Sequence, residues 1–79
     1  HHIYKMGRRP YRQIFYTLLL SVLDPIVPQN IEAIRRHVSI KAGKSVSWNT
    51  VEKYLEELVE MGKVEKIQAG KIWMYKKKI

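Results

Sequence analysis

The polar residues best suited to contact another molecule lie in one stretch, SWNTVEK, from Ser47 to Lys53. At about 100° per residue along a helix, Asn49 and Lys53 point to the same side, with Thr50 at its edge. An asparagine amide can bond an adenine edge through two atoms, and a lysine ammonium can reach guanine or a phosphate. These residue types at this spacing favour the reading of base edges in a groove of duplex DNA.

Two simpler interpretations compete with this one. Asn49 and Glu52 have the spacing of a capping box, so Asn49 could serve only to begin a helix. Lys53 could be the partner of Glu57, one helical turn later. The direction that Asn49 and Lys53 share favours contact with DNA over both.

The start of the same helix should attract phosphate. Ser47 is suited to be its N-cap, and the free backbone N–H groups of a first turn form an anion site. Lys44 and Lys71 are placed to flank this end. Trp48 lies beside the inward face, where burial is favoured over contact with the sugar-phosphate backbone. Tyr54 lies on the other side, and its hydroxyl can donate to a phosphate.

Catalysis has little support in this chain. It has no cysteine, no glycine-rich phosphate loop and no cluster with metal-ligand spacing. Its glutamates lie mostly at helical spacing between residues 52 and 60, where lysine partners explain them better than an acid–base pair. We therefore expect a binding protein and not an enzyme, with no cofactor, metal ion or small-molecule ligand.

The charge of the chain favours a polyanionic partner. Lysine and arginine number 15 against 7 acidic residues, for a net charge of +8 over 79 residues, and nucleic acid is the commonest partner of such a surface. Residues 1–9 are predicted to form a basic arm, in which His1 and His2 are set aside as remnants of a purification tag. The arginines expected to contact DNA from this end of the chain are Arg8, Arg9 and Arg12.

Length and hydropathy add two expectations. The chain is short enough for one domain, predicted at residues 10–76 with a basic tail at 77–79. It contains neither a signal peptide nor an apolar run long enough to span a membrane. We expect a cytoplasmic protein associated with the nucleoid.

Two predicted helices position the candidate site. The helix from Ser47 to Gly62 turns Val51, Leu55 and Leu58 inward, and Gly62 supplies a left-handed end. The preceding helix starts at an Asn30 cap and ends at Gly43, with a predicted buried stripe of Ile31, Ile34, Val38 and Ala42. Two helices joined by a tight turn form a helix-turn-helix.

The first helix is predicted to begin at Pro10 and to end before Asp24-Pro25. Its predicted core stripe consists of Tyr11, Ile14, Phe15, Leu18, Leu19 and Val22. A second apolar row, on the opposite side, consists of Tyr16, Leu20 and Leu23. An uncovered apolar row usually marks an interface, so we predict a homodimer joined through these three residues. The alternative is that Ile3, Tyr4 and Met6 of the arm fold back over them.

Short strands complete the predicted order of elements. KVEKIQ, at 63–68, and IWMYK, at 72–76, are rich in strand formers and are joined through Gly70, which predicts a hairpin. Trp73 and Tyr75 are expected in its core. Residues 26–28 are predicted to form a short edge strand, which Pro28 limits.

At this point the chain resembles winged helix-turn-helix DNA-binding proteins, especially small transcription regulators of the archaeal and bacterial type. The resemblance lies in AGKSVSWNTVEKYLEELVEMGKVEK, residues 42–66. It rests on the Gly43-Lys44-Ser45 turn, the Thr50-Val51 step, the Leu55 and Leu58 pair, and Gly62 before the hairpin.

The resemblance implies an α+β fold of three helices, a short strand after the first helix and a C-terminal β-hairpin wing. It also implies that the third helix enters the major groove while the wing touches the adjacent backbone. We expect a sequence-specific binder of double-stranded DNA, a transcriptional regulator. The alternatives are a winged-helix module that docks an acidic protein and a binder of nucleic acid without sequence preference.

Overall fold

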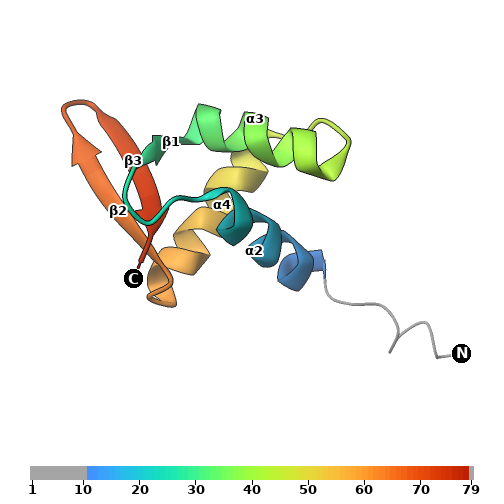
Figure 1. The fold of residues 1–79 in the computed structure, drawn as a ribbon, viewed down its shortest axis with the longest axis horizontal. Helices are drawn as coiled ribbons and strands as arrows, with labels where there is room; N and C mark the ends of the chain where they lie inside the picture. Colours follow the sequence, from blue (N-terminus) through green and yellow to red (C-terminus); the bar gives the residue numbers. More distant parts are fainter. Residues whose placement is uncertain (1–10, 79) are drawn as a thin grey trace, which may run out of the picture.

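The computed structural model describes residues 11–78 and contains three helices and a three-stranded antiparallel sheet (Figure 1). In chain order the elements are α2 (Tyr11–Val22), β1 (Gln29–Asn30), α3 (Ile31–Ala42), α4 (Trp48–Glu60), β2 (Val64–Ala69) and β3 (Ile72–Lys77). The predicted α+β fold is confirmed, and the hairpin projects from the helices as a wing does (Figure 1).

The bounds of α3 follow from its caps, as predicted. The Asn30 side chain accepts a hydrogen bond from the Ala33 backbone N–H at 2.8 Å, which satisfies a donor that the first turn leaves free. Gly43 has a φ of 73°, a left-handed conformation that costs glycine little. Its N–H can therefore turn back onto the last carbonyls of the helix.

Ser47, and not Asn49, caps α4. The Ser47 Oγ accepts from the Thr50 backbone N–H at 3.2 Å and donates to the Thr50 hydroxyl at 2.7 Å. The capping interpretation of Asn49 is therefore wrong, because the helix has already begun at Trp48. Its side chain is exposed and is not needed to start the helix.

The sheet has the order β1-β3-β2, so β3 is the central strand. A two-residue loop, Gly70-Lys71, joins β2 to β3, because Ala69 pairs with Ile72. Only Gly70 of these two has a positive φ, 69°, which is the pattern of a type II′ hairpin turn. The loop is one residue shorter than the predicted connection.

The first strand lies three residues later than predicted, at Gln29–Asn30. The Asp24 carboxylate accepts hydrogen bonds from the Ile26 and Val27 N–H groups at 2.7 and 2.9 Å. These donors are therefore used within a local turn and not in a sheet ladder. The same bonds, Val27 first, hold the pKa of Asp24 below its usual value.

The predicted basic tail is partly wrong, because Lys77 belongs to β3 and its N–H donates to the Asp24 carbonyl at 3.1 Å. The Lys76 ammonium also lies 3.6 Å from the Glu65 carboxylate, across the hairpin. The Lys78 N–H donates to the Lys63 carbonyl at 3.1 Å, so the chain is held against the domain as far as the described residues extend.

The core lies where the three helices meet the hairpin. Its buried apolar residues are Phe15, Leu19, Leu23, Ile31, Ile34, Val38, Val46, Val51, Tyr54, Leu55, Leu58, Val64 and Tyr75. The predicted stripe of α3 is confirmed except for Ala42, which is exposed at the end of the helix.

The inward face of α2 differs from the prediction. The fully buried row is Phe15, Leu19 and Leu23, while Ile14 remains 49% exposed. Leu23 is therefore a core residue and cannot form a dimer interface. Tyr16 and Leu20 are partly buried and pack against the core, because α4 covers that side of the helix. The large apolar side chains that α2 leaves about half exposed are Tyr11, whose ring still contacts that of Tyr54, and Ile14.

Candidate nucleic-acid interface

Helix α4 is buried along one face and open along the other. Val51, Leu55 and Leu58 have no exposed surface, whereas Asn49 and Lys53 are exposed and Thr50 is partly exposed. The predicted division of this helix is confirmed. Because the buried face packs against the core, the rotation of α4 is fixed, and with it the set of residues that face outward.

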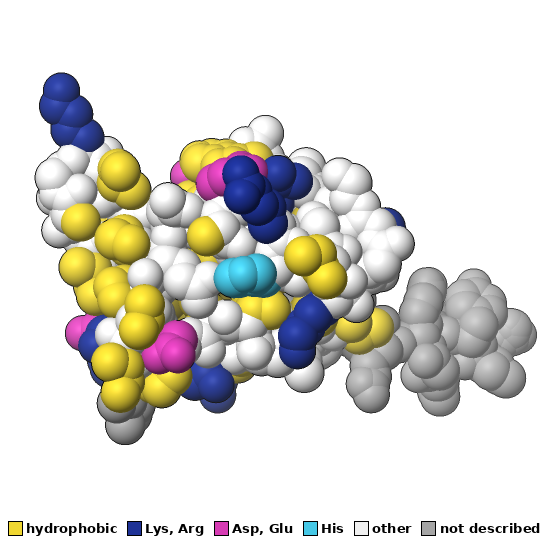
Figure 2. Space-filling model, turned by 45° about the horizontal axis from the view of Figure 1, so that its top comes forward, with side chains coloured by type: hydrophobic (Ala, Val, Ile, Leu, Met, Phe, Trp, Pro, Cys, Tyr) yellow, Lys and Arg dark blue, Asp and Glu magenta, His cyan; other side chains and the backbone are white. Residues whose placement is uncertain are grey.

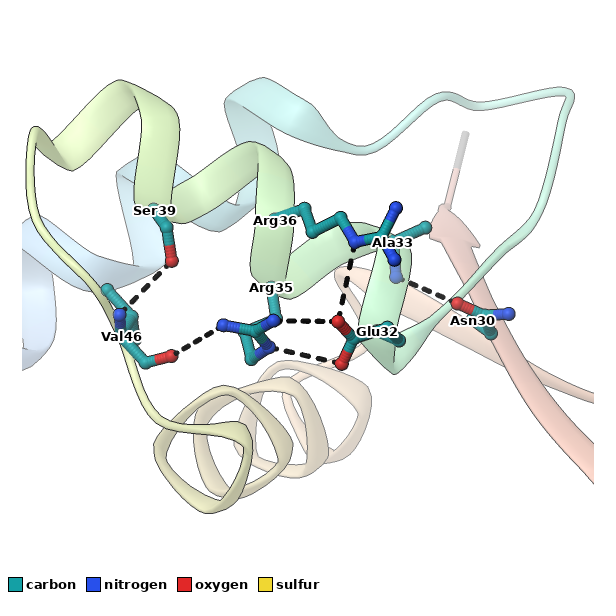
Figure 3. Close-up of polar contacts among 7 residues, drawn as sticks. All are labelled: Asn30, Glu32, Ala33, Arg35, Arg36, Ser39 and Val46. Atoms are coloured by element: carbon teal, nitrogen blue, oxygen red, sulfur yellow. Dashed lines mark hydrogen bonds and ion pairs between the residues drawn. The ribbon is translucent and has the colours of Figure 1, made fainter.

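The turn before α4 is fastened to α3 by Arg35 (Figure 3). The Arg35 guanidinium binds both carboxylate oxygens of Glu32, at 2.7 and 3.1 Å, and donates to the Val46 carbonyl at 3.4 Å. The Val46 N–H donates to the Ser39 hydroxyl at 3.1 Å. The hydrogen bond from Arg35 also holds the pKa of Glu32 below its usual value. Together these contacts set the angle at which α4 leaves the turn.

Sequence reasoning did not identify Arg35 or Ser39 as positioning residues. The only available signal was the three-residue spacing of Glu32 and Arg35, which is typical of an ordinary surface pair. Their contacts with Val46, 11 and 7 residues away in the chain, arise only when the turn folds back onto α3.

Tyr54 is a core residue, contrary to its assignment to DNA. It is only 8% exposed, and its ring packs against those of Phe15 and Tyr16, with centroids 4.9 and 5.9 Å away. Its ring therefore fastens α4 to α2. Lys53 stays outside this cluster, with its ammonium 5.4 Å from the centre of the Tyr54 ring.

Glu57 is held by α2 and not by Lys53. The Tyr16 hydroxyl donates to the Glu57 carboxylate, and the Arg12 guanidinium lies 3.5 Å from it. The hydrogen bond to Glu57 raises the pKa of Tyr16. The simpler interpretation of Lys53 as the partner of Glu57 is therefore wrong. The Arg12 side chain remains more than half exposed, although its charge is partly balanced by Glu57.

Glu56 links α4 to the wing. Its Oε2 accepts hydrogen bonds from the Lys66 ammonium and from the Tyr75 hydroxyl, each at 2.7 Å. Burial alone would raise the pKa of Glu56, but these two bonds and the charge of Lys66 lower it. Burial and the bond to Glu56 raise the pKa of Tyr75. A charged hydrogen-bond network therefore fixes β2 and β3 relative to α4.

A groove of about 460 Å³ lies between the starts of α3 and α4 and the wing, and the surface is notched between the hairpin and the helices (Figure 2). Trp48 and Trp73 both line it, 43% and 44% exposed. The burial expected for each is therefore wrong. Tyr75, in contrast, is buried as expected. Lys71 lines the same groove from the tip of the wing.

The remaining predicted site residues fall into two groups. Lys44, Ser47 and Lys71 are exposed on the turn, the cap and the wing, where the prediction placed them. Arg8, Arg9 and the basic arm lie outside the described residues. Lys44, Lys53 and Lys71 form no ion pair with any acid in residues 11–78.

Comparison of the chain with protein-family models and with curated proteins finds no match. Between residues 11 and 78, no three histidine, cysteine or acidic side chains are grouped so that they could hold a metal ion. None of the helices in that part of the chain has the length and apolar character needed to cross a membrane.

Proposed function

We propose that this protein binds double-stranded DNA with sequence specificity through α4 and acts as a transcriptional regulator. The observation that carries the proposal is that Asn49 is exposed and has no capping role. It is exposed on the outer face of a firmly anchored helix, and the cap that would otherwise explain it is supplied by Ser47. A rigid helix that holds an asparagine and a lysine outward suits the reading of base edges.

Three lysines that form no ion pair with the acids of residues 11–78 lie on neighbouring elements and support the same orientation. Lys44 precedes α4, Lys53 follows on its outer face, and Lys71 lies at the tip of the wing. Ammonium groups on either side of an inserted helix can bind the phosphates that border a groove. A reader of chromosomal DNA works inside the cell, and we include that location in the proposal.

We further propose that two copies pair through the exposed edge of α2. Ile14, 49% exposed, lines a shallow hollow of about 510 Å³ together with the partly buried Leu18, the polar Gln13, Thr17 and Ser21, and Lys41, and no charged residue occurs between Arg12 and Val22. Two copies of a chain with a net charge of +8 repel each other least across a face of α2 that carries no charge. Two-fold pairing would present two α4 helices to inverted half-sites about 10 base pairs apart.

Selection of bound sequences from a random pool of duplexes tests the main proposal. We expect one enriched motif, and we expect Asn49→Ala to weaken binding to it by about 1–3 kcal/mol while binding to random DNA changes little. Lys71→Ala is the matched control, because removal of a phosphate-binding ammonium should weaken both about equally.

Two results would contradict specific reading. Tight binding without any enriched motif would indicate a charge-driven binder without sequence preference. An unchanged motif for Asn49→Ala would mean that this residue does not read bases.

A further inference from the structure

Trp48 and Trp73 are both exposed in the groove, and the reading of base edges in a duplex by α4 does not explain their exposure. The chain contains only two tryptophans, and both line one groove although they lie 25 positions apart. Each leaves more than two-fifths of its surface in water, which is unfavourable for so large an apolar side chain. Large aromatic side chains exposed together in a concave site usually bind something.

The charges around the groove restrict what that ligand can be. The Lys66 ammonium already lies 4.5 Å from the centre of the Trp73 ring, and Lys71 adds a second ammonium. Two acidic residues line the groove as well: Glu32 is balanced by Arg35 and Arg36, and Glu52, on α4, forms no ion pair among residues 11–78. A cationic ligand held by cation–π contacts would therefore meet like charge at the ring it needs. A flat, uncharged ring can stack on Trp48 and on the face of Trp73 that Lys66 leaves open, and a phosphate attached to it can reach Lys71.

The groove also lies in the right place for a nucleotide. It separates the start of α4, which we propose enters the major groove, from the wing, which would follow the backbone. One DNA strand would therefore pass over its mouth. Within an intact duplex the bases of that strand are stacked inside the helix, but an unpaired nucleotide is free to turn its base outward.

We propose that the groove between Trp48 and Trp73 binds an unpaired nucleobase next to a duplex, by stacking on the indoles, while Lys71 holds its phosphate. This inference rests on the proposed function and extends it from plain duplex to duplex with a single-stranded extension. Stacking of one base on an aromatic side chain should tighten binding by about 5- to 150-fold.

The test measures binding of the full chain to four DNA ligands that share one duplex sequence, the motif enriched by the selection described above. They are a blunt duplex, the same duplex with a short unpaired overhang, the duplex with an abasic overhang of equal length, and the single strand alone. The abasic overhang keeps the phosphates and removes the bases. Because both tryptophans line the groove, quenching of tryptophan fluorescence reports stacking there directly.

We expect the overhang to bind about 5- to 150-fold more tightly than the blunt duplex and to quench the fluorescence. The abasic overhang should do neither. Trp73→Ala should abolish the advantage of the overhang while binding to the blunt duplex is kept, and Tyr11→Ala, an exposed aromatic on α2, should change neither. If the alanine variant is unfolded, Trp48→Phe and Trp73→Phe take its place. Each keeps an aromatic ring at the substituted position and leaves one indole whose quenching can be measured.

Equal binding of blunt and overhang duplexes without quenching would overturn this inference and leave the proposed function standing. Equal binding of the normal and abasic overhangs would overturn it too, because phosphate contacts alone would then explain the gain. Failure of all four ligands to bind would overturn the proposed function together with the inference.

Discussion

Removal of one oxygen from Tyr75 should loosen the attachment of the wing to α4. Tyr75→Phe keeps the ring, which is almost fully buried, and deletes only the hydroxyl that donates to Glu56 at 2.7 Å. The change therefore creates no cavity of side-chain size. It isolates the value of one hydrogen bond to a carboxylate.

The expected loss follows from the exposure of that carboxylate. A hydrogen bond to a charged group contributes about 1.5–3 kcal/mol to stability. The Glu56 side chain is 40% exposed and keeps its bond to Lys66, so water replaces part of the missing interaction. We expect the free energy of unfolding to fall by about 1–2 kcal/mol, and Tm by at least about 4 °C in a domain of this size.

Urea unfolding and thermal melting of Tyr75→Phe, with Tyr11→Phe as the matched control, measure this loss. Tyr11 is more than half exposed and its hydroxyl forms no hydrogen bond among the described residues, so its variant should stay within about 0.5 kcal/mol of the unmodified protein. A Tyr75→Phe variant as stable as the unmodified protein, or an equal loss in both variants, would refute the role assigned to this hydroxyl.

The same network predicts a dependence on pH. The pKa of Glu56 is lowered from its ordinary 4.5 in the folded protein, so its carboxylate stabilises the fold above that pH, and this contribution is lost as the pH falls through the lower folded value. The difference in unfolding free energy between the unmodified protein and Glu56→Gln should therefore be largest near neutral pH and shrink under acid. A difference that stayed constant across this range would contradict the assigned network.

Three further perturbations test other parts of the structure. Ser47→Ala should lower the free energy of unfolding by about 0.5–2 kcal/mol through loss of the α4 cap, and a larger loss in Asn49→Ala would reverse the assigned roles. Ile14→Glu should give monomers by sedimentation and weaken binding to an inverted repeat. The control Ile26→Glu, at an exposed isoleucine outside α2, should do neither. An unmodified protein that is already monomeric would contradict the pairing. Deletion of residues 1–9 should flatten the dependence of log affinity on log salt by about 0.9 for each phosphate that the arm neutralises, and an unchanged slope means that the arm does not touch DNA.

The features that the sequence predicted correctly depend on neighbours within one turn of chain. Asn30 and Ser47 cap the helices that follow them, because a cap needs only a side-chain oxygen three residues before a free N–H. Gly43 and Gly62 take positive φ angles after α3 and α4, a conformation that other residues rarely adopt. Local chemistry of this kind determined the order of the elements and the outward direction of Asn49 and Lys53.

The tertiary structure decided which apolar and charged side chains are covered. Helix α2 is apolar around most of its circumference, so periodicity could not tell its inward side, and packing of the domain buried Leu23 while Ile14 stayed exposed. Packing of α4 against α2 moved Tyr54 from the proposed interface into the core. The partners of Glu56 are 10 and 19 residues away, and the groove with two indoles forms only when the wing folds beside α4. These contacts join residues far apart in the chain, and no local pattern specifies them.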